Sequence, residues 1–349
     1  MHIVQQILFL VLIVAATVLF LRKVREIRRN INLGKDESFK DNPGARWKNV
    51  VLLAFGQKKM FKRMTPAILH FFVYAGFVII NVEILEIILD GIFGTHRMFA
   101  PYIGGLYNIL IGFFEILAAL VLISCAIFLV RRNVLKLKRL NQGELNGWPK
   151  TDANAILVTE IVLMGLLLTM NAADVNLQQL HSEHYFNTGS PFWVSGWIAP
   201  LFSGMSESSL IGLERVCWWL HIVGILAFLN YLPYSKHLHI VLAFPNAYYA
   251  KLVPQGKMQN MPDIQNEVLY MMEPDKAPTD LDPSAAPPRF GAKDVQDLSW
   301  KNLMDAYSCT ECGRCTAVCP ANITGKKLSP RKIMMDTRDR MEEMGKNID

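Results

Sequence analysis

Five long apolar stretches, separated by charged or polar segments, form the dominant pattern of the chain. They cover about residues 3–22, 65–90, 104–130, 153–171 and 211–233. A helix needs ~20 residues to cross ~30 Å of hydrocarbon, and each stretch lies near or above that length. Because lipid offers no partner to an unpaired backbone N–H or C=O group, each stretch must cross as a helix. The pattern predicts an all-α membrane protein built on a five-helix transmembrane bundle.

The distribution of Lys and Arg predicts the orientation of this bundle. The basic run RKVREIRR follows the first stretch, RRNVLKLKRL follows the third, and no Lys or Arg lies between Lys150 and Arg215. Loops on the cytoplasmic side carry the excess of Lys and Arg. We therefore expect a multi-pass protein of the cytoplasmic (inner) membrane, with the N-terminus outside and the segment after the fifth stretch in the cytoplasm. These loops account for the formal net charge of +6, so the charge does not call for a nucleic-acid partner.

The sharpest chemical motif lies in the polar C-terminal part. Cys309, Cys312, Cys315 and Cys319 are followed by Pro320, which gives the spacing C-x2-C-x2-C-x3-C-P. This spacing is typical of ligands to a [4Fe-4S] cluster. A structural zinc site more often has two separated C-x-x-C pairs, and disulfides do not suit a reduced cytoplasmic compartment. The motif predicts a [4Fe-4S] cluster, with zinc or no cofactor as the alternatives.

The same motif bears on domain organisation. In two-cluster ferredoxin modules the fourth cysteine of such a run ligates the other cluster. Only one run is present, so Cys319 would point toward a second cluster, and the first would lack its fourth ligand. We therefore expect a fragment, or a partner that supplies the second motif. The predicted parts are a transmembrane domain over 1–245, a cytoplasmic Pro-rich linker over 246–293 and an incomplete iron–sulfur module of helical, ferredoxin-like type over 294–349.

Histidines within the apolar stretches need a buried partner or a metal. His70 lies about two turns into the second stretch. His221 and His239 are eighteen residues apart, which on one continuous helix is five turns, or ~27 Å along one face, with His237 pointing almost the opposite way. Ligands at both membrane leaflets would suit b-type haems held between two helices. His70 can meet His239 near the inner surface, whereas the position that would pair with His221 is Ile80.

Other roles for these histidines stay open from the residues alone. His239 could be an interfacial residue, and His70 could be a core residue that hydrogen-bonds between helices. His221 could bind a second haem, bind a quinone or hydrogen-bond across the bundle. The remaining candidates, His96, His181 and His184, are expected to be ordinary loop residues.

Carboxylates are the other costly groups within the apolar stretches. Glu83, Glu86 and Asp90 are spaced about one turn apart, and Glu115 and Glu160 lie in the next two stretches. Such groups could carry protons to or from a quinone near the outer surface, or could be neutral hydrogen-bonding groups inside the bundle. Near the fifth stretch, the neighbouring Glu214 and Arg215 could pair with each other, or Arg215 could hold a haem propionate.

Two family resemblances follow from these motifs. Five stretches, an early histidine in the second and the pattern H-x17-H ending in SKHLHI resemble the cytochrome b (gamma) subunit of respiratory nitrate reductases, over about residues 1–245. The cysteine module resembles the ferredoxin part of heterodisulfide-reductase-like membrane oxidoreductases, including those that connect electron-transfer flavoprotein with menaquinone. The first resemblance implies that His70 and His239 ligate an inner haem b and His221 an outer one, although Ile80 replaces the second histidine of the family pattern.

The resemblances together predict a membrane electron-transfer protein that forms part of a quinone-linked oxidoreductase. Electrons would pass between a cytoplasmic donor, the [4Fe-4S] cluster, haem b and menaquinone or ubiquinone in the membrane. The implied donor is electron-transfer flavoprotein or a cysteine-rich iron–sulfur subunit. The alternative is a membrane-anchored iron–sulfur redox sensor or assembly protein without haem. No dinucleotide-binding glycine fingerprint or P-loop is present, which disfavours nucleotide chemistry.

Overall fold

The computed structural model describes residues 3–185, 192–254, 256–257, 260–278 and 291–348. Every regular element within these ranges is a helix, and the only β-bridge in them joins Lys35 to Ser299. Five helices are long and apolar enough to cross a membrane. These are α1 (Ile3–Ile31), α3 (Met64–Phe93), α5 (Gly105–Leu129), α6 (Trp148–Gln179) and α8 (Glu207–Tyr231). The predicted all-α, five-helix membrane fold is confirmed.

Short helices connect the long ones and form the C-terminal module. The connections contain α2 (Pro43–Asn49), η1 (Val50–Phe55), η2 (Met60–Lys62), α4 (Ala100–Ile103), η3 (Val130–Val134), η4 (Lys138–Leu140), η5 (Gly143–Leu145), α7 (Ser195–Ile198) and η6 (Ala199–Phe202). After α8 come η7 (Leu232–Tyr234), η8 (Lys236–Leu238), α9 (His239–Tyr248), α10 (Pro262–Met272), η9 (Pro274–Lys276), η10 (Val295–Asp297), α11 (Trp300–Tyr307), α12 (Arg314–Ala317), α13 (Pro320–Ile323) and α14 (Pro330–Lys346).

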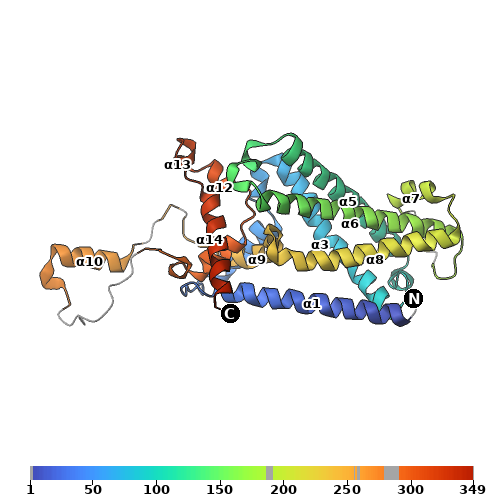
Figure 1. Cartoon of the computed structure of the whole chain (residues 1–349), viewed down its shortest axis with the longest axis horizontal. Helices are drawn as coiled ribbons and strands as arrows, with labels where there is room; N and C mark the ends of the chain where they lie inside the picture. The colour runs from blue at the N-terminus through green and yellow to red at the C-terminus, as the bar shows by residue number, and fades with distance from the viewer. Residues whose placement is uncertain (1–2, 186–191, 255, 258–259, 279–290, 349) are drawn as a thin grey trace.

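The bundle has an apolar core, and α1 lies along one side of it (Figure 1). Phe9 anchors α1 in this core, because its ring is fully buried and lies 5.2 Å from the ring of Trp218. Gly91 on α3 makes the contact possible, since an added Cβ there would lie 2.3 Å from the Phe9 ring. Many other apolar side chains of α1 are exposed, as expected for a helix that faces lipid on its outer side.

The C-terminal module packs against one end of the bundle, where α1 ends and α9 begins (Figure 1). A second apolar core joins the two parts and contains Ile27, Ile31, Leu238, Val295, Leu303, Met304, Ala306, Tyr307 and Met341. Polar contacts close the same interface. The Asn30 side-chain amide donates to the Tyr307 hydroxyl at 3.1 Å, and Arg29 donates to the Gly345 carbonyl at 2.9 Å.

The segment predicted as a linker contains an additional helix. In Figure 1, α10 lies away from the rest of the molecule. The boundary predicted at 245–246 falls inside α9, because this helix belongs to both parts: the Asn246 amide donates to the Ser308 hydroxyl at 2.5 Å. Residues 279–290 of the predicted linker lie outside the described residues. The division into domains therefore stays a prediction.

Replacing Gly345 by Ala should loosen the docking of α14 on α1. An added Cβ would lie 2.3 Å from Oδ1 of the buried Asn30, and overpacking of this kind typically costs about 1–3 kcal/mol. We expect a lower thermal unfolding midpoint in detergent and faster proteolytic release of the module. In the control variant Gly165→Ala the new methyl group meets no neighbouring group within 4 Å, so both measurements should match the wild type. Identical behaviour of the two variants would show that the α1–α14 contact is not tight.

Candidate functional site

The four cysteines of the motif lie in the segment between α11 and α13, and Cys315 belongs to the short helix α12 within it. All four are free thiols, and Cys315 is the exposed one. Gly313 has φ +70°, and a Cβ there would lie 2.7 Å from Nη1 of Arg331 and 3.0 Å from Cγ of Arg139. Only glycine suits this position, which lets the loop fold tightly around its sulfur atoms. Among the described residues, no three His, Cys, Asp or Glu side chains are placed to hold a single metal ion.

The surroundings of the buried cysteines affect their protonation. Burial raises the pKa of the Cys309 thiol. Burial acts the same way on Cys312, but a hydrogen bond from the Arg314 backbone N–H and the positive charge of that residue outweigh it, so the pKa of Cys312 is lowered. A thiolate is the form that binds iron, and N–H groups directed at its sulfur stabilise it. The loop therefore supplies thiol groups of the kind that ligate an iron–sulfur cluster.

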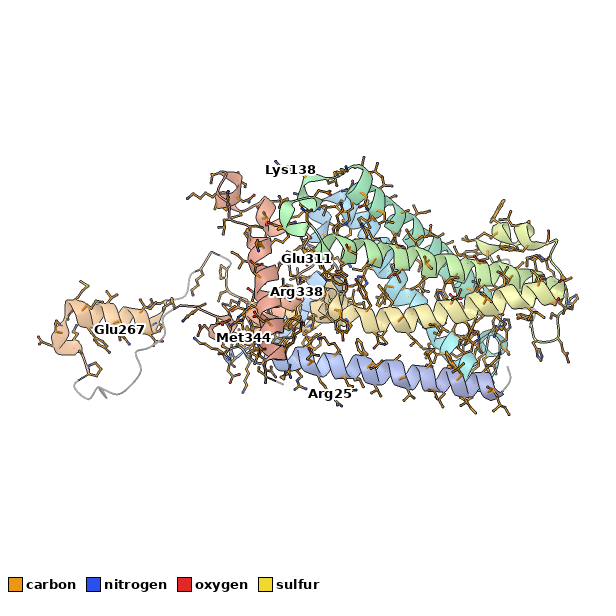
Figure 2. The ribbon with its side chains drawn as sticks, in the orientation of Figure 1. Arg25, Lys138, Glu267, Glu311, Arg338 and Met344 are labelled. Carbon is orange, nitrogen blue, oxygen red and sulfur yellow. The ribbon has the colours of Figure 1, made fainter. Side chains whose placement is uncertain are left out.

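Glu311 holds this loop to the rest of the protein. Its side chain is 3% exposed, and it forms ion pairs with Lys236 and with Arg338 of α14, the latter at 3.0 Å. Figure 2 shows Glu311 and Arg338 close together beside α14. Burial would raise the pKa of Glu311, but the two cations outweigh that effect and lower it. The loop is thus attached through a buried, fully paired carboxylate, a feature that the sequence pattern did not reveal.

Lys236 connects the cysteine loop with the histidine segment. Besides its ion pair with Glu311, its Nζ donates to the Pro149 carbonyl at 2.6 Å, and its backbone N–H donates to Asp152 at 3.1 Å. Its own carbonyl accepts a hydrogen bond from Nδ1 of His239 at 3.1 Å. One residue therefore contacts the cysteine loop with its side chain and a candidate ligand with its backbone.

The structure brings the rings of His70 and His239 together near the module. Their ring centroids are 6.4 Å apart and the rings are inclined by 42°. Nδ1 of His70 lies 3.0 Å from Oε1 of Gln57, and Nδ1 of His239 lies 3.1 Å from the Lys236 carbonyl. Both Nδ1 atoms then donate, which leaves both Nε2 atoms for a ligand, the usual arrangement of metal-binding histidines.

The spacing of these two rings suits one metal atom between them. With a metal–nitrogen bond of about 2 Å and about 1 Å from nitrogen to ring centre, two imidazoles that share one metal atom would have centroids up to about 6 Å apart. Burial lowers the pKa of His239. The neutral ring is the form that binds a metal. The separation of the two rings is therefore compatible with one metal atom between them.

The expectation of one continuous helix face from His221 to His239 is wrong. α8 ends at Tyr231 and two short 3₁₀ turns follow, because Pro233 has no N–H to continue the helix. The turn also moves His237, which was expected to point away. Its ring lies 5.5 Å from the ring of His239. Burial, then the neighbouring His239 and His70, lowers the pKa of His237 to about 3, so it stays neutral beside the pair.

His221 is placed differently. Its side chain is fully buried in α8, and Nδ1 donates to the Leu163 carbonyl at 3.0 Å. Its Nε2 has no hydrogen-bond partner among the described residues. No other histidine ring in the described ranges contacts it, and Ile80 is part of the packed apolar core. The structure thus brings His70 and His239 together, but gives His221 no second histidine.

A buried polar network occupies the opposite end of the bundle. Arg97 donates to Asp174 at 2.7 Å, to Asn171 at 2.9 Å and to the Tyr107 hydroxyl at 3.3 Å. The Tyr107 hydroxyl in turn donates to Glu86 at 2.7 Å. The sequence reading missed Arg97 and Asp174, because they lie at a loop and at a helix end and only the fold brings them together.

A small cavity of about 30 Å³ lies within this network. Its lining includes Glu83, Glu86, Asp90, His96, Arg97, Asp174, Glu214, Arg215 and Trp218. Glu214 and Arg215 form an ion pair, which is one of the two roles considered for Arg215. Oε2 of Glu83 and Nδ1 of His96 have no hydrogen-bond partner among the described residues. A polar cavity of this size can hold about one water molecule.

Comparison with known proteins supports the iron–sulfur assignment. Residues 268–324 match the family described as 4Fe-4S dicluster domain. The chain is 29% identical over 347 residues to the probable iron–sulfur-binding oxidoreductase FadF of Bacillus subtilis (strain 168), covering 98% of this chain and 44% of that protein. It is 29% identical over 287 residues to the EtfAB:quinone oxidoreductase of Syntrophomonas wolfei, covering 80% of this chain and 35% of that protein.

A third similarity concerns the module alone. Over 57 residues the chain is 42% identical to a probable membrane-anchored ferredoxin of Chromohalobacter salexigens, covering 16% of this chain and 8% of that protein. The chain spans less than half the length of each of these relatives. No solved structure matches it. Together, fold and similarities support the class of membrane proteins that transfer electrons through a 4Fe-4S cluster, while the likeness to nitrate-reductase gamma subunits stays a prediction.

Replacing Lys236 by Met should weaken the attachment of the cysteine loop. Removing one partner of a buried ion pair costs up to about 3–5 kcal/mol, and the loss should be smaller here because Arg338 still pairs with Glu311. Thermal unfolding in detergent should show a lower midpoint for the module. Lys332→Met is the matched control, because its ion pair with Asp336 is exposed on both sides. If both variants lower the midpoint equally, Lys236 has no special role in attachment.

Proposed function

We propose that this chain is the membrane electron-transfer part of a quinone-linked oxidoreductase. It would carry electrons between a cytoplasmic donor, a [4Fe-4S] cluster, haem b and the quinone pool. The observation that carries the proposal is the direct connection from the cysteine loop through Glu311 and Lys236 to His239. The similarity to an EtfAB:quinone oxidoreductase supports the same reading.

Cys309, Cys312 and Cys315 are the proposed ligands of the cluster, and Cys319 would serve a second cluster. The match to a dicluster family supports this division, since in such modules the fourth cysteine of a run ligates the other cluster. When bound, a [4Fe-4S] cluster accepts and releases one electron at a time. The residues of this chain hold the loop in place through Glu311 and stabilise the thiolate of Cys312 through the Arg314 N–H.

His70 and His239 are the proposed ligands of one haem b, which would supply a second one-electron centre when bound. The separation of the rings and the engagement of both Nδ1 atoms support this assignment. Among the described residues, Nε2 of His221 has no hydrogen-bond partner and no histidine lies opposite it, so the proposal is one haem. His221 instead offers a hydrogen-bonding group within the apolar core, where a quinone could meet it.

The donor and the acceptor are proposed from chemistry and similarity together. Electron-transfer flavoprotein, or a cysteine-rich iron–sulfur subunit, would dock on the cytoplasmic module, and menaquinone or ubiquinone would exchange electrons within the membrane. A quinone takes up two protons with two electrons, so a proton path is required. Glu83 and His96 line one polar cavity and each has an unpartnered atom, which supports a role in that path. The N-terminus would lie outside and the module in the cytoplasm.

Reduced-minus-oxidised visible spectra of anaerobically purified protein test the haem assignment. We expect a haem b alpha band at about one haem per chain, quantified as the pyridine haemochrome. His70→Ala and His239→Ala should each remove this band and leave the cluster absorbance, because one imidazole cannot replace two. His221→Ala should leave the haem content unchanged. A wild-type protein with a full cluster and no haem would instead support an iron–sulfur sensor or assembly protein.

Cysteine variants test the cluster ligands separately from the haem. Replacing Cys309, Cys312 or Cys315 by Ser should remove most of the iron and sulfide and leave the haem band, because thiolates are the ligands of the cluster. Cys319→Ser should retain the first cluster if Cys319 serves a second one. The control is Cys125→Ser, a buried thiol within α5 and outside the module. Wild-type iron and sulfide in the Cys309 variant would contradict the ligand assignment.

A further inference from the structure

A second cavity lies where the bundle meets the module, and nothing in the proposed electron path uses it. Its volume is about 430 Å³. It lies between the start of α3 and the segment that follows α5, and is lined by Arg63, Met64, Thr65, Pro66, Arg131, Leu137, Lys138 and Arg139. Figure 2 shows Lys138 at the end of the bundle near α12. The site therefore lies at the ends of two membrane-spanning helices.

The cavity has an excess of positive charge. Arg63, Arg131, Lys138 and Arg139 all line it, and none forms an ion pair within 4 Å in the part of the chain that the structure describes. Burial, then the nearby charge of Arg63, lowers the pKa of Arg139. Four cations gathered at one place repel each other, and an anion among them would relieve this repulsion. The cavity is thus built to receive a negatively charged group.

The apolar part of the lining narrows the class of ligand. Met64, Pro66 and Leu137 line the same cavity, and Val134 and Leu135 beside it are 71% and 60% exposed. Exposed apolar side chains at the end of a membrane-spanning helix are covered by lipid. A ligand that fits both features has an anionic head and apolar tails. Basic pockets between helices at the cytoplasmic surface bind anionic lipid headgroups in this way.

We propose that this cavity binds the phosphodiester headgroup of an anionic phospholipid. The segment that forms its wall also supports the cysteine loop. The Arg139 carbonyl accepts a hydrogen bond from Arg331 at 2.9 Å, and the fully buried Arg331 also pairs with Glu144 at 2.6 Å. A bound headgroup would neutralise the cations on one side of this segment, while the module packs on the other.

Native mass spectrometry of the full chain in detergent tests the proposal, with phosphatidylglycerol as the probe and phosphatidylcholine as the neutral-headgroup comparison. The wild type should bind phosphatidylglycerol and not phosphatidylcholine. Arg63→Gln/Arg131→Gln should bind phosphatidylglycerol about 30-fold more weakly, at about fivefold per lost cation. Lys138→Gln alone, which removes an exposed side chain, should give about fivefold. The control Lys326→Gln/Lys327→Gln removes two exposed charges elsewhere and should bind normally.

Three results would overturn the proposal. Equal binding of the two lipids would show that the headgroup charge is not recognised. Binding by inorganic phosphate as tight as by phosphatidylglycerol would identify a free-phosphate site. Normal phosphatidylglycerol binding in Arg63→Gln/Arg131→Gln, accompanied by loss of haem, would assign these cations to haem propionates. Each readout is independent of catalytic activity, so failure here is distinguishable from failure of the proposed electron transfer.

Discussion

The short turn between α8 and α9, residues 232–238, determines how the two parts of the protein meet. Pro233 ends α8, and the Ser235 hydroxyl then accepts the backbone N–H of His237 at 3.0 Å. Asp152 on α6 fixes the turn from the other side, by accepting the Tyr231 hydroxyl at 2.5 Å and the Lys236 N–H at 3.1 Å. This reversal brings His239 opposite His70, and it places Lys236 against the cysteine loop.

Buried charges make the contact between bundle and module specific. Lys236, Glu311 and Arg331 are all nearly or fully inaccessible to solvent, and each is paired. An unpaired charge at such positions is strongly unfavourable, so the module cannot shift without breaking several pairs together. The apolar core shared by α1, α11 and α14 holds the module on the bundle, while these ion pairs fix the position in which it docks. A fixed position matters for electron transfer because it keeps the two proposed centres at a constant separation.

At the other end of the bundle, buried carboxylates bind the connecting loops. There the carboxylates of Glu86, Asp90 and Glu115 accept backbone N–H groups of the connecting loops, as when Glu86 accepts Phe99 N–H at 2.8 Å and Glu115 accepts Val194 N–H at 2.9 Å. Most of the acids that resemble a proton ladder in sequence therefore also hold loops in place. Glu83 differs, because one of its oxygens has no partner in the described residues. This unpartnered oxygen is the basis for the proposed role of Glu83 in proton exchange.

The sequence by itself determined the class of fold and located the cysteine loop that we propose as the cluster site. Membrane spans are readable from composition, because lipid excludes every alternative to a helix, and the cysteine spacing is local to one loop. The pairing of His70 with His239 was also predicted. The sequence did not predict how the chain brings His239 to His70. The spacing argument assumed one continuous helix, and α8 ends at Tyr231.

Only the tertiary structure decided the roles of Lys236, Glu311, Arg97 and Asp174. Lys236 pairs with Glu311, and Arg97 with Asp174, in each case across more than seventy positions, and such pairings leave no periodic trace in a single sequence. The same holds for the cationic cavity. Arg63 and Arg139 belong to separate basic loops in the sequence, which support the predicted membrane orientation. They line one site only because α3 and α5 pack side by side. The chemistry of a side chain and its preference for water or lipid can be read at each position of the sequence. A site built from distant segments exists only in the folded state, because bringing those segments together costs conformational entropy that other contacts must offset.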